Sequence, residues 1–306
     1  MSKHLKRIAD AYILEQRRAR RWRIFWRFCW LVVAIAIIGL LFSGFSSKTD
    51  VTNDHIALIK VDGIIADDSN ANAQRINASL DAAFKDKNTK AVIMQINSPG
   101  GSPVQSDDIY EHMRFLQNKY PHTPLYAVCV DVCASGGYYI ASAAKDIYAN
   151  KMTITGSIGV RAGGFGFVEL LKKIGVERRL YTAGKDKGFL DPFEPQSASQ
   201  VAEMEAMLSE THQVFIDAVK AGRGERLDNK ADDKIFSGVP FSGMQAKKYG
   251  LIDGFGSVDS LQREKFNNME VVDYTKALNL LDQLSQKLGT EVVYQAAQAS
   301  SMKLQL

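Results

Sequence analysis

Cysteine and histidine, which hold metal ions and build disulfide frameworks, are scarce in this sequence. The 306 residues include three cysteines and five histidines. Cys129 and Cys133 have a C-x3-C spacing, which is neither the redox C-x-x-C motif nor a complete zinc site. We expect both to be small buried residues and predict no metal site, although an oxidising compartment would permit a disulfide.

Nucleotide-binding motifs are also missing. The sequence contains no G-x-x-x-x-G-K-[ST] and no G-x-G-x-x-G that opens a helix with an acidic residue downstream. It does contain four glycine-rich turns, which are Ser98–Gly101, Ala134–Tyr138, Thr155–Gly159 and Gly163–Gly166. The first three follow predicted strands, where α/β folds place their ligand-binding crevices. These turns therefore predict a site, but not one for a nucleotide.

The overall composition excludes several classes of protein. With 46% apolar and 24% charged residues, the chain resembles neither a disordered protein nor one with many membrane spans. It has no internal repeat and no long linker rich in proline or serine. The length allows one large domain or two small ones.

The net charge of +4 is distributed very unevenly. Residues 1–47 contain nine lysines and arginines against only Asp10 and Glu15, a net charge of +7, which leaves −3 for the remainder. The basic character belongs to the N-terminal segment, so it is poor evidence for a nucleic acid partner of the main body. For the Arg-rich residues 17–27, anionic lipid is favoured over RNA as the partner.

An uncharged apolar run follows this basic segment. Residues 28–45 carry no charge, and a helix of that length would span roughly 27 Å, close to the thickness of a bilayer core. The positive-inside rule then predicts a basic cytoplasmic segment (1–27), a transmembrane anchor (28–46) and an extracytoplasmic remainder. A cleavable signal peptide is the alternative, but no A-x-A site closes the run.

Beyond residue 54, apolar strands and helices alternate, which is typical of an α/β fold with parallel strands. Predicted strands cover residues 55–61, 91–97, 125–130, 147–149, 178–182 and 270–274. Predicted helices cover residues 71–86, 104–120, 167–174 and 197–222, and another begins at Ser135. We expect one domain over residues 54–275 and a helical tail over residues 276–306.

Ser135 lies between a predicted strand and a predicted helix and is followed by two glycines. Such a turn can present a hydroxyl beside unpaired backbone N–H groups, which stabilise the oxyanion of an acyl-transfer reaction. Gly100 and Gly101, after the neighbouring strand, are candidates for a second donor. Tight packing alone would also explain any single Gly-Gly turn.

A serine nucleophile needs a base. His55, His112, His122 and His212 all lie outside the glycine-rich turns, so we expect each to be a solvated surface residue. A lysine base is the alternative, which requires that burial lower the pKa of an amine by about three units, roughly 4 kcal/mol. Lys185 and Lys187 follow a predicted strand, and the residues alone do not choose between them because both point the same way in an extended segment.

Five motifs occur in order along the chain. They are Ile96-Asn-Ser-Pro-Gly-Gly101, Ala134-Ser-Gly-Gly-Tyr-Tyr139, Thr155-Gly-Ser-Ile-Gly-Val160, Ala183-Gly-Lys-Asp-Lys-Gly188 and Gly243-Met-Gln-Ala-Lys-Lys-Tyr-Gly-Leu-Ile-Asp253. Together they resemble the signal peptide peptidase A/SohB family of Ser-Lys peptidases, over about residues 54–260. The length and the single anchor resemble its short members, which have one catalytic domain. Cys133 departs from the pattern, because small apolar residues are common at its position.

The resemblance implies a ClpP/crotonase-like fold of repeated βα units, preceded by one N-terminal transmembrane helix. It assigns Ser135 as the nucleophile and Lys187 as the general base, with Ser157 positioning the lysine. The backbone N–H groups of Gly101 and Gly136 would form the oxyanion hole, and no cofactor is implied.

The resemblance also implies a cellular setting. Members of the family digest remnant signal peptides and form ring-like homo-oligomers, in which the serine and the lysine can come from neighbouring subunits. For this chain we therefore expect a single-pass protein of the inner membrane, with the N-terminus inside and a periplasmic peptidase domain that acts on peptides. Two alternatives are a catalytically silent, membrane-anchored scaffold of the same fold and a crotonase-like acyl-CoA enzyme. The second is disfavoured because no cluster for the CoA phosphates is present.

Overall fold

The computed structural model describes residues 20–35 and 53–276. Residues 20–35 are helical, and within the described residues no helix is long and apolar enough to span a membrane. Residues 36–46 of the predicted anchor, residues 1–19 of the predicted cytoplasmic segment and the predicted tail from residue 277 onward lie outside the described residues.

Residues Val51–Ala277 form one compact unit, built on a single sheet. Its strands are β1 (His55–Asp62), β2 (Thr89–Ser98), β3 (Leu125–Ala134), β4 (Asp146–Ala149), β5 (Ile154–Gly156), β6 (Pro240–Ser242), β7 (Gly254–Phe255) and β8 (Glu270–Asp273). The main order is β6-β5-β3-β2-β1-β8, and β4 pairs with both β3 and β7. All pairs are parallel except β5 with β6, which confirms the expected α/β fold, whereas the antiparallel pairing of β6 was not predicted.

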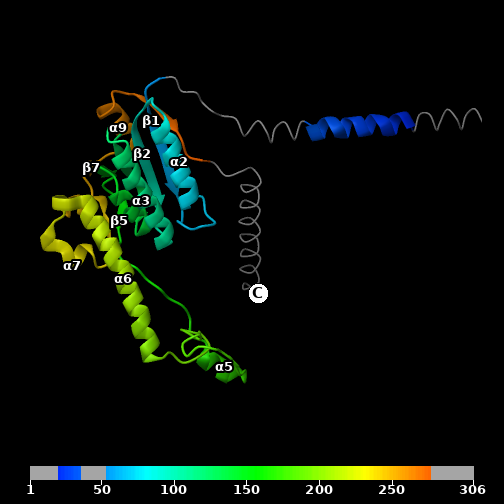
Figure 1. Ribbon diagram of the computed structural model, residues 1–306, viewed down its shortest axis with the longest axis vertical. Coiled ribbons are helices and arrows are strands. Elements are labelled where there is room, and N and C mark those ends of the chain that lie inside the picture. The colour runs from blue at the N-terminus through cyan, green and yellow to red at the C-terminus, as the bar shows by residue number, and fades with distance from the viewer. Residues whose placement is uncertain (1–19, 36–52, 277–306) are drawn as a thin grey trace, which may run out of the picture. The chain divides into compact units, whose positions relative to one another are not determined.

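Helices pack on both faces of this sheet, whereas α5 (Val168–Ile174) lies away from it (Figure 1). The other helices are α2 (Ala73–Lys85), α3 (Pro103–Lys119), α4 (Gly136–Ser142), α6 (Ala198–Arg223), α7 (Asp232–Ile235), α8 (Gly243–Lys248) and α9 (Val258–Glu264). Capping side chains stabilise the first turns of α2 and α3: Asn72 accepts a hydrogen bond from the Arg75 N–H, and Ser102, before Pro103, accepts one from the Gln105 N–H.

Side chains of β1 alternate between two apolar cores, one on each face of the sheet. Ile59 and its neighbours two residues away lie in the larger core with residues of α2, α3 and α4. Ile56 and Leu58 face the smaller core, which α9 closes with Leu261. Successive side chains of β1 thus point to opposite faces of the sheet, and both faces are apolar because a parallel strand is buried on each side.

Residues 159–214 form an arm that extends from this unit. Every residue of the arm is described, and none is buried, whereas Ile158 and Phe215 at its two ends are. Figure 1 shows α5 at the far end of α6, away from the sheet. The predicted strand at residues 178–182 is wrong: the segment has no strand partner, and it is held instead by polar contacts such as Arg178 with Asp191 at 3.0 Å.

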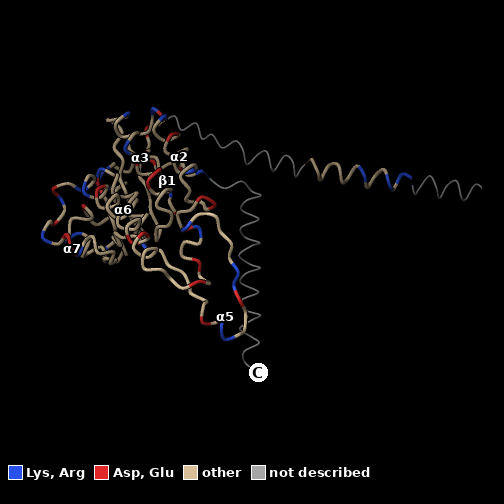
Figure 2. The backbone as a smooth tube through the Cα atoms, turned by 60° about the horizontal axis from the view of Figure 1, so that its bottom comes forward, with Lys and Arg blue, Asp and Glu red and all other residues tan. Residues whose placement is uncertain are grey.

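Only the C-terminal end of α6 is anchored in the unit. Arg223, whose side chain is 0% exposed, donates two hydrogen bonds to the Asp253 carboxylate, at 2.7 and 3.0 Å, and a third to the Gly250 carbonyl. This fork-like pairing fixes the base of the arm. Charges of both signs are interspersed over the unit, as Figure 2 shows.

Candidate active site

Ser135 and Ser157 lie side by side at one edge of the sheet, at the carboxyl ends of two neighbouring parallel strands. The last register pair of β3 and β5 is Ala134 with Gly156, so each serine is the residue that follows its strand. The Ser135 N–H donates a hydrogen bond to the Gly156 carbonyl at 2.8 Å, which joins the two strand ends. The structure therefore brings together two of the residues that the sequence predicted for the site.

The backbone of Ser135 has a conformation that a serine seldom adopts. Its φ is 51° and its ψ is −124°, and α4 begins at the next residue. Its side chain makes no capping hydrogen bond to α4, although serine is a favoured capping residue. A sharp strand-to-helix turn of this kind presents a hydroxyl outward at the top of a sheet, and such strained residues cluster at active sites.

Glycines from the β2–α3 turn lie against this serine. A Cβ built on Gly100 would be 2.6 Å from the Gly136 nitrogen and 2.8 Å from the Ser135 Cβ, so only glycine fits there. A Cβ on Gly136 would lie 3.3 Å from the Gly101 nitrogen. Among the described residues, neither the Gly101 N–H nor the Gly136 N–H makes a hydrogen bond. Two free amide donors beside a hydroxyl are the parts of an oxyanion hole.

Ser157 repeats the backbone feature of Ser135. Its φ is also 51°, its N–H donates to the Val239 carbonyl at 3.1 Å, and its Oγ donates to the Gly238 carbonyl at 3.2 Å. The loop before β6 therefore fixes Ser157 in place. This serine is preorganised, but its contact within the described residues is with a carbonyl and not with a lysine.

Lys187 is not part of this cluster. It lies in the arm, where the segment Gly184–Asp191, which follows the predicted strand at residues 178–182, forms successive turns. Its side chain is exposed, and within residues 53–276 no hydrogen bond or ion pair joins it to Ser135 or Ser157. The described chain thus holds the predicted nucleophile and oxyanion hole in one place and the predicted base in another.

The histidines are more structural than the sequence indicated. The expectation of a solvated surface residue is wrong for His55, which is 0% exposed and hydrogen-bonded to the Tyr274 hydroxyl and the Asn53 carbonyl. His112 pairs with Asp81 at 3.0 Å, and His212 contacts the Ile158 carbonyl at 3.0 Å. Each of these three histidines has a hydrogen-bond partner other than Ser135, and the partner of His212 is the residue that follows Ser157.

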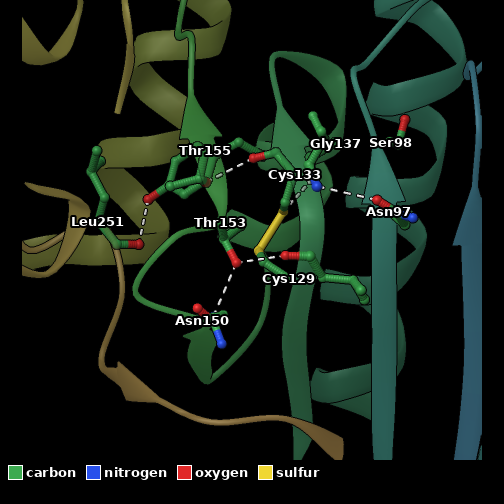
Figure 3. Close-up of a disulfide and its surroundings, with 12 residues drawn as sticks. Asn97, Ser98, Cys129, Cys133, Gly137, Asn150, Thr153, Thr155 and Leu251 are labelled. Atoms are coloured by element: carbon green, nitrogen blue, oxygen red, sulfur yellow. Dashed lines mark hydrogen bonds between the residues drawn. A yellow bond between two sulfur atoms is a disulfide. The ribbon is translucent and has the colours of Figure 1, made fainter. Parts of the chain in front are cut away.

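The cysteine expectation is half right. Cys129 and Cys133 are both buried, as predicted, but they form a disulfide and are not separate small residues (Figure 3). Four residues along a straight strand span about 13 Å, which made such a bond unexpected. The strand bends between them, so that their Cα atoms lie 5.3 Å apart.

Comparisons with known proteins place this chain in a family. The model of peptidase family S49 matches residues 117–272, and the model of the Clp protease family matches residues 52–155. The chain belongs to peptidase family S49. The resemblance to signal peptide peptidase A and its relatives, and the ClpP-like character of the unit, are thereby confirmed.

Curated relatives agree with this assignment. The chain is 30% identical over 256 residues to a putative signal peptide peptidase SppA of Enterococcus faecium, covering 78% of this chain and 73% of that one. It is 32% identical over 206 residues to protease 4 of Haemophilus influenzae, covering 66% of this chain and 33% of that one.

A third relative carries a different name. A protein of Brucella abortus called Na(+)/H(+) antiporter NhaA is 47% identical over 189 residues, which cover 62% of this chain but only 25% of that protein. The chain thus spans about a quarter of the length of this relative. The match says nothing of the remaining three quarters of the Brucella protein.

Proposed function

We propose that this chain is a membrane-anchored serine peptidase with a Ser135–Lys187 dyad. The observation that carries the proposal is the Ser135 turn, with a free side chain beside the unpaired N–H groups of Gly101 and Gly136. Membership of family S49 supports peptide bonds as the substrate.

The proposed reaction begins when the Ser135 Oγ attacks the carbonyl carbon of a peptide bond. The carbonyl oxygen becomes an oxyanion, which accepts hydrogen bonds from the Gly101 and Gly136 N–H groups. The neutral Lys187 amine takes the hydroxyl proton and gives it to the departing amine. Water then hydrolyses the acyl-enzyme, and Ser157 positions the lysine.

Because the arm holds Lys187 away from Ser135, we propose that the base comes from a neighbouring copy of the chain. The arm exposes large apolar side chains, among them Phe165 at 82% and Tyr181 at 89%, and buries none of its residues. Exposed apolar surface of this extent is typical of an interface. Packing of the arm against a second copy would bury these side chains and surround the amine with apolar groups, which favours its neutral form.

The proposed location follows from the charge and hydropathy of the N-terminal residues. The net charge of +7 on residues 1–47 and the uncharged run at residues 28–45 favour an inner-membrane anchor with the peptidase domain outside. An enzyme held next to the bilayer suits apolar peptides, so remnant signal peptides are the proposed substrates.

Labelling with a fluorophosphonate probe tests the nucleophile and the base together. We expect the full-length protein to label at Ser135, and both Ser135→Ala and Lys187→Ala to lower labelling and peptide cleavage on the order of 10³-fold or more. Lys185→Ala is the matched control, since Lys185 lies two residues away in the same exposed turn, and it should keep full activity.

A folded Lys187→Ala protein with wild-type activity would refute the proposed dyad. Absence of labelling in the assembled wild-type protein would refute the proposed peptidase activity and favour the catalytically silent scaffold. Circular dichroism of each variant distinguishes these results from misfolding.

A further inference from the structure

The strand that carries Ser135 is interrupted shortly before it reaches the serine. On β2, Ile96 and Ser98 are two residues apart, whereas their partners on β3, Cys129 and Cys133, are four apart. Two additional residues are therefore accommodated on β3, which makes a bulge at residues 130–132. Bulges next to active sites commonly redirect a side chain.

The bulge is held at three points. The Val132 N–H donates to the Asn97 Oδ1 at 3.1 Å, and the Thr153 hydroxyl donates to the Val130 carbonyl. The third point is covalent: the Cys129–Cys133 disulfide joins the two ends of the bulge (Figure 3). Both cysteines are buried, so the bond lies inside the sheet layer and not on the surface.

The bulge also separates the two parts of β3. Residues Tyr126–Cys129 pair with β4, and residues Val132–Ala134 pair with β5. The second part ends directly at Ser135, whose position is therefore set by where β3 emerges from the bulge. Cys133 is two residues before Ser135, its carbonyl accepts from the Thr155 hydroxyl at 2.7 Å, and its Sγ lies 3.7 Å from the Gly137 carbonyl in α4.

We propose that the Cys129–Cys133 disulfide is a positioning bond for the nucleophile, and that its cleavage by a dithiol lowers the reactivity of Ser135. The inference rests on the proposed function, because it concerns the serine of the proposed dyad. In the reduction, two thiols of the reductant supply two electrons and two protons; the S–S bond becomes two thiols, and the reductant leaves as its own disulfide. The reduced bulge keeps its two hydrogen bonds but loses its covalent closure.

The bond contributes less to global stability than a disulfide that closes a longer loop. It closes a loop of only five residues, and the stabilisation from a cross-link grows with the length of the loop that it closes. A displacement of the serine by about 1 Å, in contrast, can change a reaction rate by up to two orders of magnitude. Loss of the bond should therefore slow the chemical step even in protein that remains folded.

The double variant Cys129→Ala/Cys133→Ala tests this in the full-length protein. We expect its rate of fluorophosphonate labelling and its kcat to fall on the order of tenfold, with KM changed little and the protein still folded at the assay temperature. Cys29→Ala is the control, because Cys29 is the third cysteine and lies outside the disulfide. Wild-type protein reduced by a dithiol in mild denaturant should lose activity to the same extent and regain it with a disulfide oxidant, whereas the double variant should not respond.

Hydrogen exchange of the peptide covering residues 129–139 gives a readout that does not depend on catalysis. Reduction should speed exchange of the Val132 and Ser135 amides, whose hydrogen bonds hold the bulge and the strand end. Unchanged exchange and unchanged labelling without the bond would overturn the proposal, as would alkylation of both thiols in unreduced protein. If exchange responds but Ser135 never labels, the positioning bond stands and the proposed function fails.

Discussion

At the scale of single residues, the site is made of backbone conformations that cost free energy. Ser135 and Ser157 both have a φ of 51°, and a serine held in such a region costs about 1–3 kcal/mol. The surroundings maintain this strain: the Gly156 carbonyl holds Ser135, and the loop at Gly238 and Val239 holds Ser157. The strain lowers the free energy of unfolding, but it keeps the hydroxyl of Ser135 in a fixed, accessible position.

Substitution of Gly100 should disrupt this arrangement directly. The added Cβ of Gly100→Ala would be 2.6 Å from the Gly136 nitrogen, at a φ of 97°. We expect the free energy of unfolding to fall by about 3 kcal/mol and the rate of Ser135 labelling to fall strongly, since relief of the overlap moves the oxyanion donor. Gly63→Ala is the control: its φ is 82° but its Cβ would meet nothing within 4 Å, so labelling should persist. Equal labelling of the two variants would contradict the assignment of Gly136.

The ion pair at the base of the arm predicts a pH dependence of stability. Burial raises the pKa of Asp253, but the hydrogen bonds from Arg223 and from the Ile147 N–H more than offset this, so the pKa lies below its ordinary value of 3.8. A lowered pKa means that the carboxylate stabilises the folded state above pH 3.8, and that this stabilisation is lost as the pH falls through the folded-state pKa.

Asp253→Asn should therefore destabilise the protein at pH 7 by about 3 kcal/mol, because it leaves the buried Arg223 without a counter-ion. Urea unfolding at pH 7 and at pH 3 measures the difference, which should shrink at the lower pH. Asp54→Asn removes an exposed pair with Lys90 and should change stability by less than about 1 kcal/mol. A pH-independent effect of Asp253→Asn would show that its charge is not responsible.

At the scale of elements, the sequence predicted well wherever local patterns agree with long-range packing. Strands β1, β2 and β3 and helices α2 and α3 lie within a few residues of their predicted bounds, because apolar runs and caps such as Ser102 act locally. The strand expected at residues 178–182 failed because strand formation needs a partner, and the arm supplies none. The Cys129–Cys133 bond was missed because a bulge that depends on Asn97 and Thr153 leaves no mark in a spacing pattern.

The candidate site was predictable to the same degree. The turn at Ser135 was predicted, but β5, which ends in register with β3 and so brings Ser157 beside Ser135, was not among the predicted strands. The position of Lys187 was not predictable, because it depends on the long exposed course of the arm and on contacts that the proposed assembly must supply.

The arm also gives a prediction at this scale. In dilute, monomeric protein, trypsin should cut first within residues 160–197, at exposed sites such as Arg179 and Lys185, because no residue there is buried. In concentrated, assembled protein the same sites should be protected at least about tenfold if the arm packs against a second copy. Mass spectrometry of the first fragments decides between these outcomes, and equal cleavage in both states would contradict the proposed interface.

At the scale of the whole molecule, the account predicts a fixed orientation in the membrane. Protease added outside intact spheroplasts should digest residues 53–276 and leave the basic residues 1–27 protected, because the uneven charge sets which side stays inside. Immunoblots with tags at each end of the chain measure both sides. Protection of the peptidase unit before lysis would contradict the proposed location.

The central claim is that Ser135 and Lys187 act together although one chain holds them apart, so the base must come from another copy. The most direct measurement mixes Ser135→Ala protein with Lys187→Ala protein, each inactive alone, under conditions that allow subunits to exchange. We predict that peptide cleavage and labelling of the Ser135 in the Lys187→Ala subunit both return in the mixture. A mixture that assembles but remains inactive would contradict the account.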